Sequence, residues 1–255
     1  MNALDQACTS VPNASSALTF KQRAGRWLFP RLPITRFLFD ILRDEMAAWI
    51  VRAQNACLPG RRRRLRRLRA ARELYVNVAC GPQLLDGFVN LDLHPAGGEV
   101  VAWDARRSLP LSDGTARGIR AEQFVEHLET IEELPAFLRD CYRTLAPGGV
   151  LRLIVPDAER YLHAYCRPDL SGFRELDVPD PFPDDLPTRM DVINHVFHQR
   201  HEHRWAYDFE TLAHRLSAAG FGAVERKSFR HSHDARLAQD RDVHAPYSLY
   251  VEAIR

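Results

Sequence analysis

The sequence predicts an α/β fold, in which a mostly parallel β-sheet is flanked by helices and preceded by an N-terminal helical arm. Two observations predict it. From Leu74 onward, short apolar runs typical of buried strands alternate with amphipathic stretches, the pattern of βαβ units. The 255 residues with 45% hydrophobic content are enough for one large domain with its own core. We therefore expect an arm over residues 1–72 and an α/β domain over 73–255, with a lid insertion at about 157–207.

The arm combines a helix with a strongly basic segment. Apolar residues recur at spacings of three and four over residues 35–56, and Pro59-Gly60 ends that helix. Residues 61–72 follow with eight arginines and no acid, and Leu65 and Leu68 indicate a second, short helix. Without these eight, 27 of the 35 basic residues remain against 33 acidic ones, so a net charge of +2 hides a basic arm on an acidic body.

The elements of the α/β domain follow from apolar periodicity and turn residues. Strands are expected over residues 74–79, 88–91, 100–103, 118–124, 150–155, 223–229 and 247–254. Helices are expected over residues 131–145, 189–199 and 208–219, and the last begins at the N-cap Asp208 and ends at Gly220. Residues 167–187 are rich in proline and aspartate without periodicity, and are expected to form a long loop within the lid.

The connection between the first two strands is short. Only six residues separate Gly81 from Phe88, whereas a parallel crossover usually needs a dozen or more. We therefore expect this first crossover to be a tight loop and not a helix.

Three polar or small-residue features come at the ends of successive strands, the edge at which open α/β sheets bind ligands. The first is the turn Asn77–Gly81, whose small residues let a ligand approach the backbone closely. Asp92 ends the second strand, where a carboxylate can accept both hydroxyls of a ribose. Asp104 ends the third strand, within reach of an exocyclic amine. Each feature alone is weak, because aspartate after a strand is also a common turn or cap residue.

Five segments together carry a family resemblance. They are Tyr75–Gly81, Asn90–Asp92, Asp104-Ala105, Glu126–Leu128 and Leu145–Leu151. In order and spacing they resemble the class I S-adenosylmethionine-dependent methyltransferases, and most closely the type 11 group. The resemblance implies a Rossmann-like fold in which residues 73–255 form the methyltransferase domain and S-adenosylmethionine lies across the C-terminal edge of the sheet.

The resemblance also implies roles for individual residues. Ala79 and Gly81 would lie against the methionine part of the cofactor. Asp92 would bind the ribose and Asp104 the adenine amino group, with Gln123 near the end of the fourth strand.

Two positions depart from the family pattern. Most members have glycine where Ala79 stands and an acid where Asn77 stands. Asn77 can still hydrogen-bond the cofactor's amine, but it lacks the charge attraction of a carboxylate. A degenerate methyltransferase fold that acts as a binding or scaffold subunit is therefore the non-enzymatic alternative.

Histidines concentrate after the flexible part of the lid, residues 167–187, where such folds recognise the acceptor. Residues 194–205 contain four of them, and an imidazole is a natural base for removing a proton from a hydroxyl near neutral pH. His203 and His127, which follows the fourth strand, are the candidate catalytic bases; packing or surface roles are the alternative. His195 and His198 share a helix face, but without cysteines or a standard ligand spacing no metal site is expected.

The most favoured reaction is O-methylation of a small molecule or glycan, with RNA methylation or N-methylation as alternatives. No Asn/Asp-Pro-Pro-Tyr signature of amine methylation is present. Residues 61–72 are expected to be a solvated or acid-paired helix face, and their functional alternatives are an anionic acceptor or an anionic membrane surface. Nucleic acid is disfavoured because the body is acidic and carries no recognised RNA-binding module. Aromatic residues in and before the first helix make membrane contact or a homodimer further alternatives: Trp27, Phe29, Phe37, Phe39 and Trp49.

The chain is expected to be cytoplasmic. Its five cysteines are scattered without a CxxC pair, which favours reduced thiols over a disulfide framework. No apolar run reaches the length of a membrane span, and residues 1–6 do not resemble a secretion signal. The strong preference for arginine over lysine is typical of GC-rich bacterial genomes.

Overall fold

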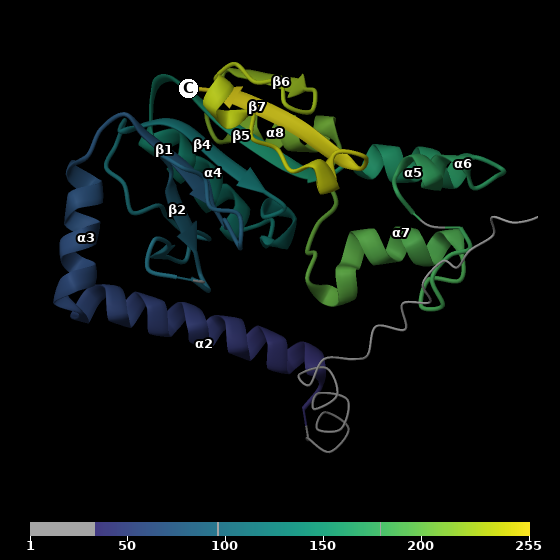
Figure 1. Cartoon of the computed structure of the whole chain (residues 1–255), viewed down its shortest axis with the longest axis horizontal. Helices are drawn as coiled ribbons and strands as arrows, with labels where there is room; N and C mark the ends of the chain where they lie inside the picture. The colour runs from purple at the N-terminus through teal and green to yellow at the C-terminus, as the bar shows by residue number, and fades with distance from the viewer. Residues whose placement is uncertain (1–33, 96, 179) are drawn as a thin grey trace, which may run out of the picture. The chain divides into compact units, whose positions relative to one another are not determined.

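A seven-stranded sheet organises the chain, with the strand order β3-β2-β1-β4-β5-β7-β6 (Figure 1). Its strands are β1 (Leu74–Val78), β2 (Val89–Asp92), β3 (Val101–Ala102), β4 (Ala116–Glu122), β5 (Leu145–Pro156), β6 (Ala223–Lys227) and β7 (Ser248–Ile254). The first five are parallel, whereas β7 pairs antiparallel with β5 and β6 antiparallel with β7. The expected fold class, a mostly parallel Rossmann-like α/β sheet, is confirmed.

The computed structural model describes residues 34–95, 97–178 and 180–255. They belong to two compact units, one ending at Asp44 and the other running from Glu45 to Arg255. No helix in these ranges is both long enough and apolar enough to cross a lipid bilayer.

The helices include those expected and two that were not. They are α2 (Arg36–Cys57), α3 (Pro59–Ala70), α4 (Glu133–Thr144), α5 (Ala158–Cys166), α6 (Ser171–Glu175), α7 (Arg189–His198) and α8 (Phe209–Ala218). Asp208 caps α8 as expected, because its carboxylate accepts the backbone N–H of Thr211 at 2.8 Å. The expectation of a structureless loop over residues 167–187 is wrong in part, because α6 lies within it. Helices α5, α6 and α7 share a small apolar core of their own.

Helices α4 and α8 lie on one face of the sheet (Figure 1). Spacings of three and four along α4 place Leu134, Phe137, Leu138 and Cys141 on one side, and all four are buried in the main core. Leu212 and Leu216 of α8 belong to the same core. The apolar sides of α4 and α8 therefore pack on this face of the sheet and form part of the main core.

The first crossover is a tight loop, as expected. Residues 79–88 join β1 to the adjacent parallel strand β2 without a helix. Asn90 holds the loop: its Oδ1 accepts the N–H of Leu85, and its Nδ2 donates to the carbonyl of Leu85, both at 3.1 Å. Asn77 donates to the carbonyl of Gln83 at 2.9 Å and to Asn90 Oδ1 at 3.0 Å.

A row of polar side chains crosses six strands of the sheet. Strand register aligns Asn90, Asn77, Arg120, Arg152, Glu252 and Glu225 in turn, from β2 to β6. If apolar helices covered this row, its charged side chains would be buried without partners, which is costly. An irregular connection between β6 and β7, which we call the β6–β7 segment (residues 228–247), supplies the partners instead.

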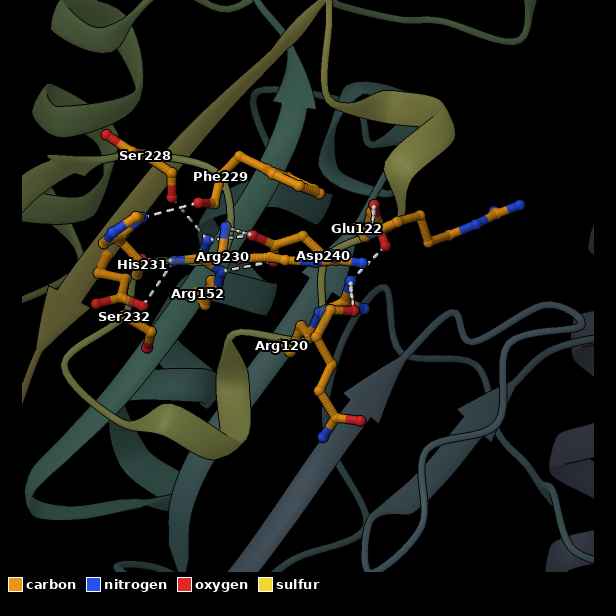
Figure 2. A network of polar contacts seen from close by, with 12 residues as sticks. Arg120, Glu122, Arg152, Ser228, Phe229, Arg230, His231, Ser232 and Asp240 are labelled. Atoms are coloured by element: carbon orange, nitrogen blue, oxygen red, sulfur yellow. Dashed lines mark hydrogen bonds and ion pairs between the residues drawn. The ribbon is translucent and has the colours of Figure 1, made fainter.

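Figure 2 shows how the β6–β7 segment bonds two buried arginines, neutralising Arg152 through Asp240 and giving Arg120 a backbone carbonyl. Arg152 is fully buried and donates to Asp240 at 2.9 and 2.5 Å, and to Glu252 at 2.8 Å. Arg120 is paired with Glu122 and also donates to the carbonyl of Gln239 at 3.1 Å. The central strands are therefore tied by charge to the C-terminal part of the chain.

Helix α3 and the C-terminal end of α2 are bonded to the sheet within the second unit. Leu65 of α3 is buried in the main core, and Arg64 donates to the carbonyls of Gly98 and Val100, each at 3.0 Å. Asn55 of α2 donates to the carbonyl of Ala102 at 2.9 Å. The division at residues 72 and 73 stays a prediction. Two of the expected aromatic residues, Trp27 and Phe29, lie outside the described residues.

Candidate functional site at the carboxyl edge of the sheet

The turn after β1 is built for close approach. Ala79 and Gly81 both have left-handed backbone conformations, with φ of 51° and 50°. A Cβ added to Gly81 would meet no atom within 4 Å, so the space beside this residue is open. Glycine, which the methyltransferases that the sequence resembles usually carry in place of Ala79, suits the same conformation, because a left-handed conformation costs a non-glycine residue about 1–2 kcal/mol.

Asp92, at the end of β2, is joined directly to this turn. One carboxylate oxygen accepts the N–H of Gly81 at 2.8 Å and the other accepts the N–H of His94 at 2.7 Å. An ionised carboxylate has about four lone-pair positions, so each oxygen can accept one further donor. The side chain is partly exposed. The structure thus brings together two of the predicted cofactor-binding residues, Gly81 and Asp92.

Asp104 is held differently, by two arginines. Arg106 donates to its Oδ1 from Nε at 2.9 Å and to its Oδ2 from Nη2 at 3.1 Å, and Arg52 forms an ion pair with Oδ2. The N–H of Arg106 also donates to Oδ1 at 3.2 Å. Burial opposes ionisation of Asp104, but the bonds and charge of these arginines outweigh it and lower its pKa. A ligand amine could reach this carboxylate only by displacing one of the four donors.

The remaining predicted cofactor residues lie on β1 and after β4. Gln123 directly follows β4 with φ of 52°, and its Nε2 lies 3.3 Å from Ser248 Oγ. Asn77 is buried, and its amide group is bonded within the loop after β1. The side chain of Asn77 therefore positions that loop in this structure.

The two candidate bases, His127 and His203, lie against each other. Their ring centroids are 4.8 Å apart at an interplanar angle of 80°. His203 Nδ1 is bonded to the carbonyl of Val196 at 2.6 Å, and His127 Nδ1 to that of Glu202 at 3.0 Å. Burial lowers the pKa of His127 and lowers that of His203 to about 4, so both rings are neutral at pH 7. Each ring bonds a carbonyl through Nδ1, which leaves Nε2 as its second site.

Glu126 completes the cluster and was not predicted as a site residue. It is buried, and neither carboxylate oxygen has a hydrogen-bond partner in the structure. Burial raises its pKa to about 8. One ligand atom each of Glu126, His127 and His203 lies within 4.8 Å of the other two. The sequence signal was available, because Glu126 directly precedes a candidate base, but nothing in the sequence shows its burial.

A small cavity adjoins this cluster. Its free volume is about 10 Å³, and Glu126, His203, Trp205 and Tyr207 are among the residues that line it. That volume matches about one water molecule. The Tyr207 hydroxyl is also buried without a hydrogen-bond partner in the structure. By contrast, His195 and His198, the pair considered from sequence for a metal, are both exposed.

A larger, basic cavity lies beside the arm, distinct from the histidine cluster. Its volume is about 670 Å³, and its lining includes Asp104, Trp103 and five arginines: Arg52, Arg62, Arg66, Arg69 and Arg107. Within the described residues, four of these arginines form no ion pair; Arg52 is the exception. The expected acid pairing of residues 61–72 is therefore not seen in the described part of the chain.

Comparisons with known proteins give low similarity throughout. No protein-family model matches the sequence, and no curated protein matches it. Among solved structures, the chain is similar to a SAM-dependent methyltransferase from Archaeoglobus fulgidus, at 16% identity over 85% of this chain and 100% of that one, with a TM-score of 0.42. It is similar to an S-adenosylmethionine-dependent methyltransferase from Mesorhizobium loti, at 16% identity over 75% and 96% of the two chains, with a TM-score of 0.43.

A third similar structure is a SAM-dependent methyltransferase from Thermotoga maritima described as a possible histamine N-methyltransferase. Its identity is 13%, over 86% of this chain and 96% of that one, with a TM-score of 0.43. Because these identities and TM-scores are low, we take neither activity nor substrate from the three matches.

Proposed function

We propose that the chain is an S-adenosylmethionine-dependent methyltransferase that methylates an oxygen of a small molecule or glycan. The open turn at Gly81, bonded to the Asp92 carboxylate at the carboxyl edge of the sheet, is the observation that carries the proposal. This is the edge at which open α/β sheets bind their ligands. It is also where the family resemblance of the sequence places the cofactor.

The residues fit part of this cofactor well. The open space at Gly81 admits a ligand chain, and Asp92 has lone pairs free for two ribose hydroxyls. Gln123 lies at the end of the neighbouring strand β4. Asp104 can bind the adenine amino group only if it gives up one of its arginine donors. This requirement favours the alternative in which the methyltransferase fold is degenerate and acts as a binding or scaffold subunit.

The cofactor, when bound, supplies an electrophilic methyl group on a sulfonium, and the chain must position the acceptor and remove its proton. We assign proton removal to the cluster after β4. The Nε2 atom of His203 or His127 accepts the proton from the acceptor hydroxyl. Glu126 is less than 5 Å away, and its raised pKa allows it to keep a proton near neutral pH. His203 is the preferred base because it also lines the cavity.

Calorimetric titration with S-adenosylmethionine and S-adenosylhomocysteine tests this function. We expect one site that binds both. Absence of heat with both compounds, on folded protein, would establish the binding or scaffold alternative. A screen for methyl transfer, with the cofactor present, then distinguishes acceptors that carry a hydroxyl group from amine or RNA acceptors.

We further propose that the acceptor carries an anionic group at some distance from the methylated atom. The basic cavity could hold a phosphate, sulfate or carboxylate through several guanidinium groups. It includes Asp104, at the end of β3, whereas the histidines follow β4. Three strand spacings separate these two strands, roughly 14 Å. Such an acceptor is therefore extended, as a charged glycan or a sugar phosphate is.

Two matched double variants on α3 test the cavity. Arg62→Gln/Arg66→Gln removes two lining charges, and Arg63→Gln/Arg67→Gln removes two charges outside the lining at the same helical spacing. With pyrophosphate as the probe, we expect the first pair to weaken binding about 10-fold or more and the second to have little effect. Equal losses would indicate a diffuse basic surface instead, and binding to anionic vesicles or to RNA would then identify its partner.

A further inference from the structure

The cluster of Glu126, His127 and His203 has the composition of a metal site. A carboxylate with two imidazoles is a donor set found for zinc and for iron(II) in proteins. One ligand atom of each residue lies within 4.8 Å of the others. The three come from two segments far apart in sequence, the turn η2 (Val125–His127) and the residue after the lid helices, so the fold itself brings them together.

Both imidazoles already make the kind of hydrogen bond that holds a metal-binding histidine in place. Metal-binding histidines almost always donate the second ring N–H to a carbonyl or carboxylate, which fixes the ring and its tautomer. His203 Nδ1 lies 2.6 Å from the carbonyl of Val196, and His127 Nδ1 lies 3.0 Å from that of Glu202. In each ring this bond makes Nε2 the atom that can accept a metal.

Glu126 supplies the second, independent observation. Its side chain is almost completely buried, and both oxygens lack a hydrogen-bond partner. A buried carboxylate without partners requires neutralisation by a proton or by a cation. It also lines the one-water cavity together with His203, so the space beside these donors is about that of one water molecule or one ion.

We propose that Glu126, His127 and His203 bind a divalent transition-metal ion of the zinc type, with one coordination position open to the cavity. Bond lengths of about 2.0–2.1 Å imply ligand atoms roughly 3.3 Å apart in a tetrahedral site. Binding therefore draws the three donors together from their present separations. Two nitrogen donors disfavour magnesium and calcium, which take oxygen ligands.

The position of the site suggests what the ion does. In the methyltransferase proposed above, its open position would take the acceptor oxygen and make that hydroxyl more acidic, with the proton leaving to water. Histidines that hold the ion are then ligands and no longer bases. This role rests on the proposed function, whereas binding of the ion does not.

Metal titration of the full chain tests the site directly. Protein treated with a chelator and freed of it is titrated with Zn²⁺, Co²⁺ and Mg²⁺, without S-adenosylmethionine or acceptor. We expect one Zn²⁺ per chain, a visible absorption spectrum with Co²⁺, no binding of Mg²⁺, and a higher melting temperature with Zn²⁺. Wild-type protein that binds no Zn²⁺ would overturn the proposal, whatever its affinity for S-adenosylmethionine.

Variants then locate the ion. Glu126→Gln keeps the shape of the side chain but removes its charge, and it should lower Zn²⁺ affinity at least 10-fold and abolish the thermal shift, as should His203→Ala. The matched control His195→Ala/His198→Ala removes the two exposed histidines of α7 and should leave both readouts unchanged. Loss of binding in the control, with binding retained in Glu126→Gln, would place the ion on the surface and refute the site.

Discussion

Replacing Asp240 with alanine is expected to destabilise the fold strongly. The change removes the carboxylate that accepts two bonds from Arg152 and one from the N–H of Arg230, at 2.7 Å. Arg152 and Asp240 both have side chains with 0% exposure. Removing one partner of a buried pair costs about 3–5 kcal/mol. Because Arg152 keeps Glu252, we expect about 3 kcal/mol, the lower end of this range.

The loss is measured by urea unfolding followed by circular dichroism, and in a protein of this size it corresponds to a fall of roughly 10 °C in melting temperature. Asp242→Ala is the matched control. Asp242 lies in the same segment and pairs with Arg230 at 2.9 Å, but its side chain is 77% exposed. Exposed pairs contribute about 0–1 kcal/mol. If both variants lose the same small amount, the buried network does not stabilise the sheet and this reasoning is wrong.

Four further predictions concern the carboxyl edge. Asp92→Ala should weaken S-adenosylmethionine binding by about 1.5–3 kcal/mol in calorimetry, from lost charge-assisted bonds, whereas Asp86→Ala in the loop before β2 should not. Ala79→Gly should raise the free energy of unfolding by about 1 kcal/mol, because it relieves a left-handed alanine; a loss would show that the alanine methyl group packs favourably. The pKa of Asp104 is lower in the folded protein than in the unfolded chain, where it is about 3.9. The ionised carboxylate therefore stabilises the folded state above about pH 3.9, and this stabilisation is lost as the pH falls through the pKa of the folded protein. The free energy of unfolding of the wild type should therefore exceed that of Asp104→Asn by less at about pH 3 than at about pH 6, as measured by urea unfolding. A difference that is larger at about pH 3 would contradict the lowered pKa of Asp104. His203→Ala should keep cofactor affinity but lose turnover by roughly 10²–10⁴-fold, and near wild-type turnover would exclude His203 as the base.

Local patterns were sufficient for the strands of the sheet and for the described α-helices other than α5 and α6. Apolar runs between turn residues predicted each strand of the sheet, and the Asp208 cap with the Gly220 stop predicted α8 within a residue. The short spacing between Gly81 and Phe88 correctly predicted a loop crossover. These features depend on neighbours a few residues away, so the sequence displays them directly.

The row of polar side chains across the sheet, and the β6–β7 segment that covers it, could not be predicted from local patterns. Arg152 pairs with Asp240, 88 positions away in the sequence, and residues 230–246 show no periodicity that marks them as the cover of a sheet face. Helices α5 and α6 were missed because they are short and form their own small core with α7. Their stability comes from contacts across the lid, which no local pattern displays.

The candidate site was predicted in part for the same reason. Residues at strand ends were correctly placed at one edge, since chain direction fixes that position. Which donors reach a carboxylate depends on distant segments: Arg52 on α2 pairs with Asp104. Glu126 is buried and lines the same small cavity as Tyr207, which is far from it in the sequence, and only the folded chain shows this.

The polar row has a consequence for the order in which the chain folds during synthesis. Arg120 and Arg152 lie on the central strands, but Gln239, Asp240 and Glu252, which bond them, are made 88 to 119 residues later. Domains generally fold as units while the ribosome adds residues. In this chain the nascent sheet cannot bury Arg152 together with its carboxylate partners until residues 240 and 252 have been made. We therefore expect a chain terminated before residue 240 to be captured by chaperones instead of forming the parallel sheet.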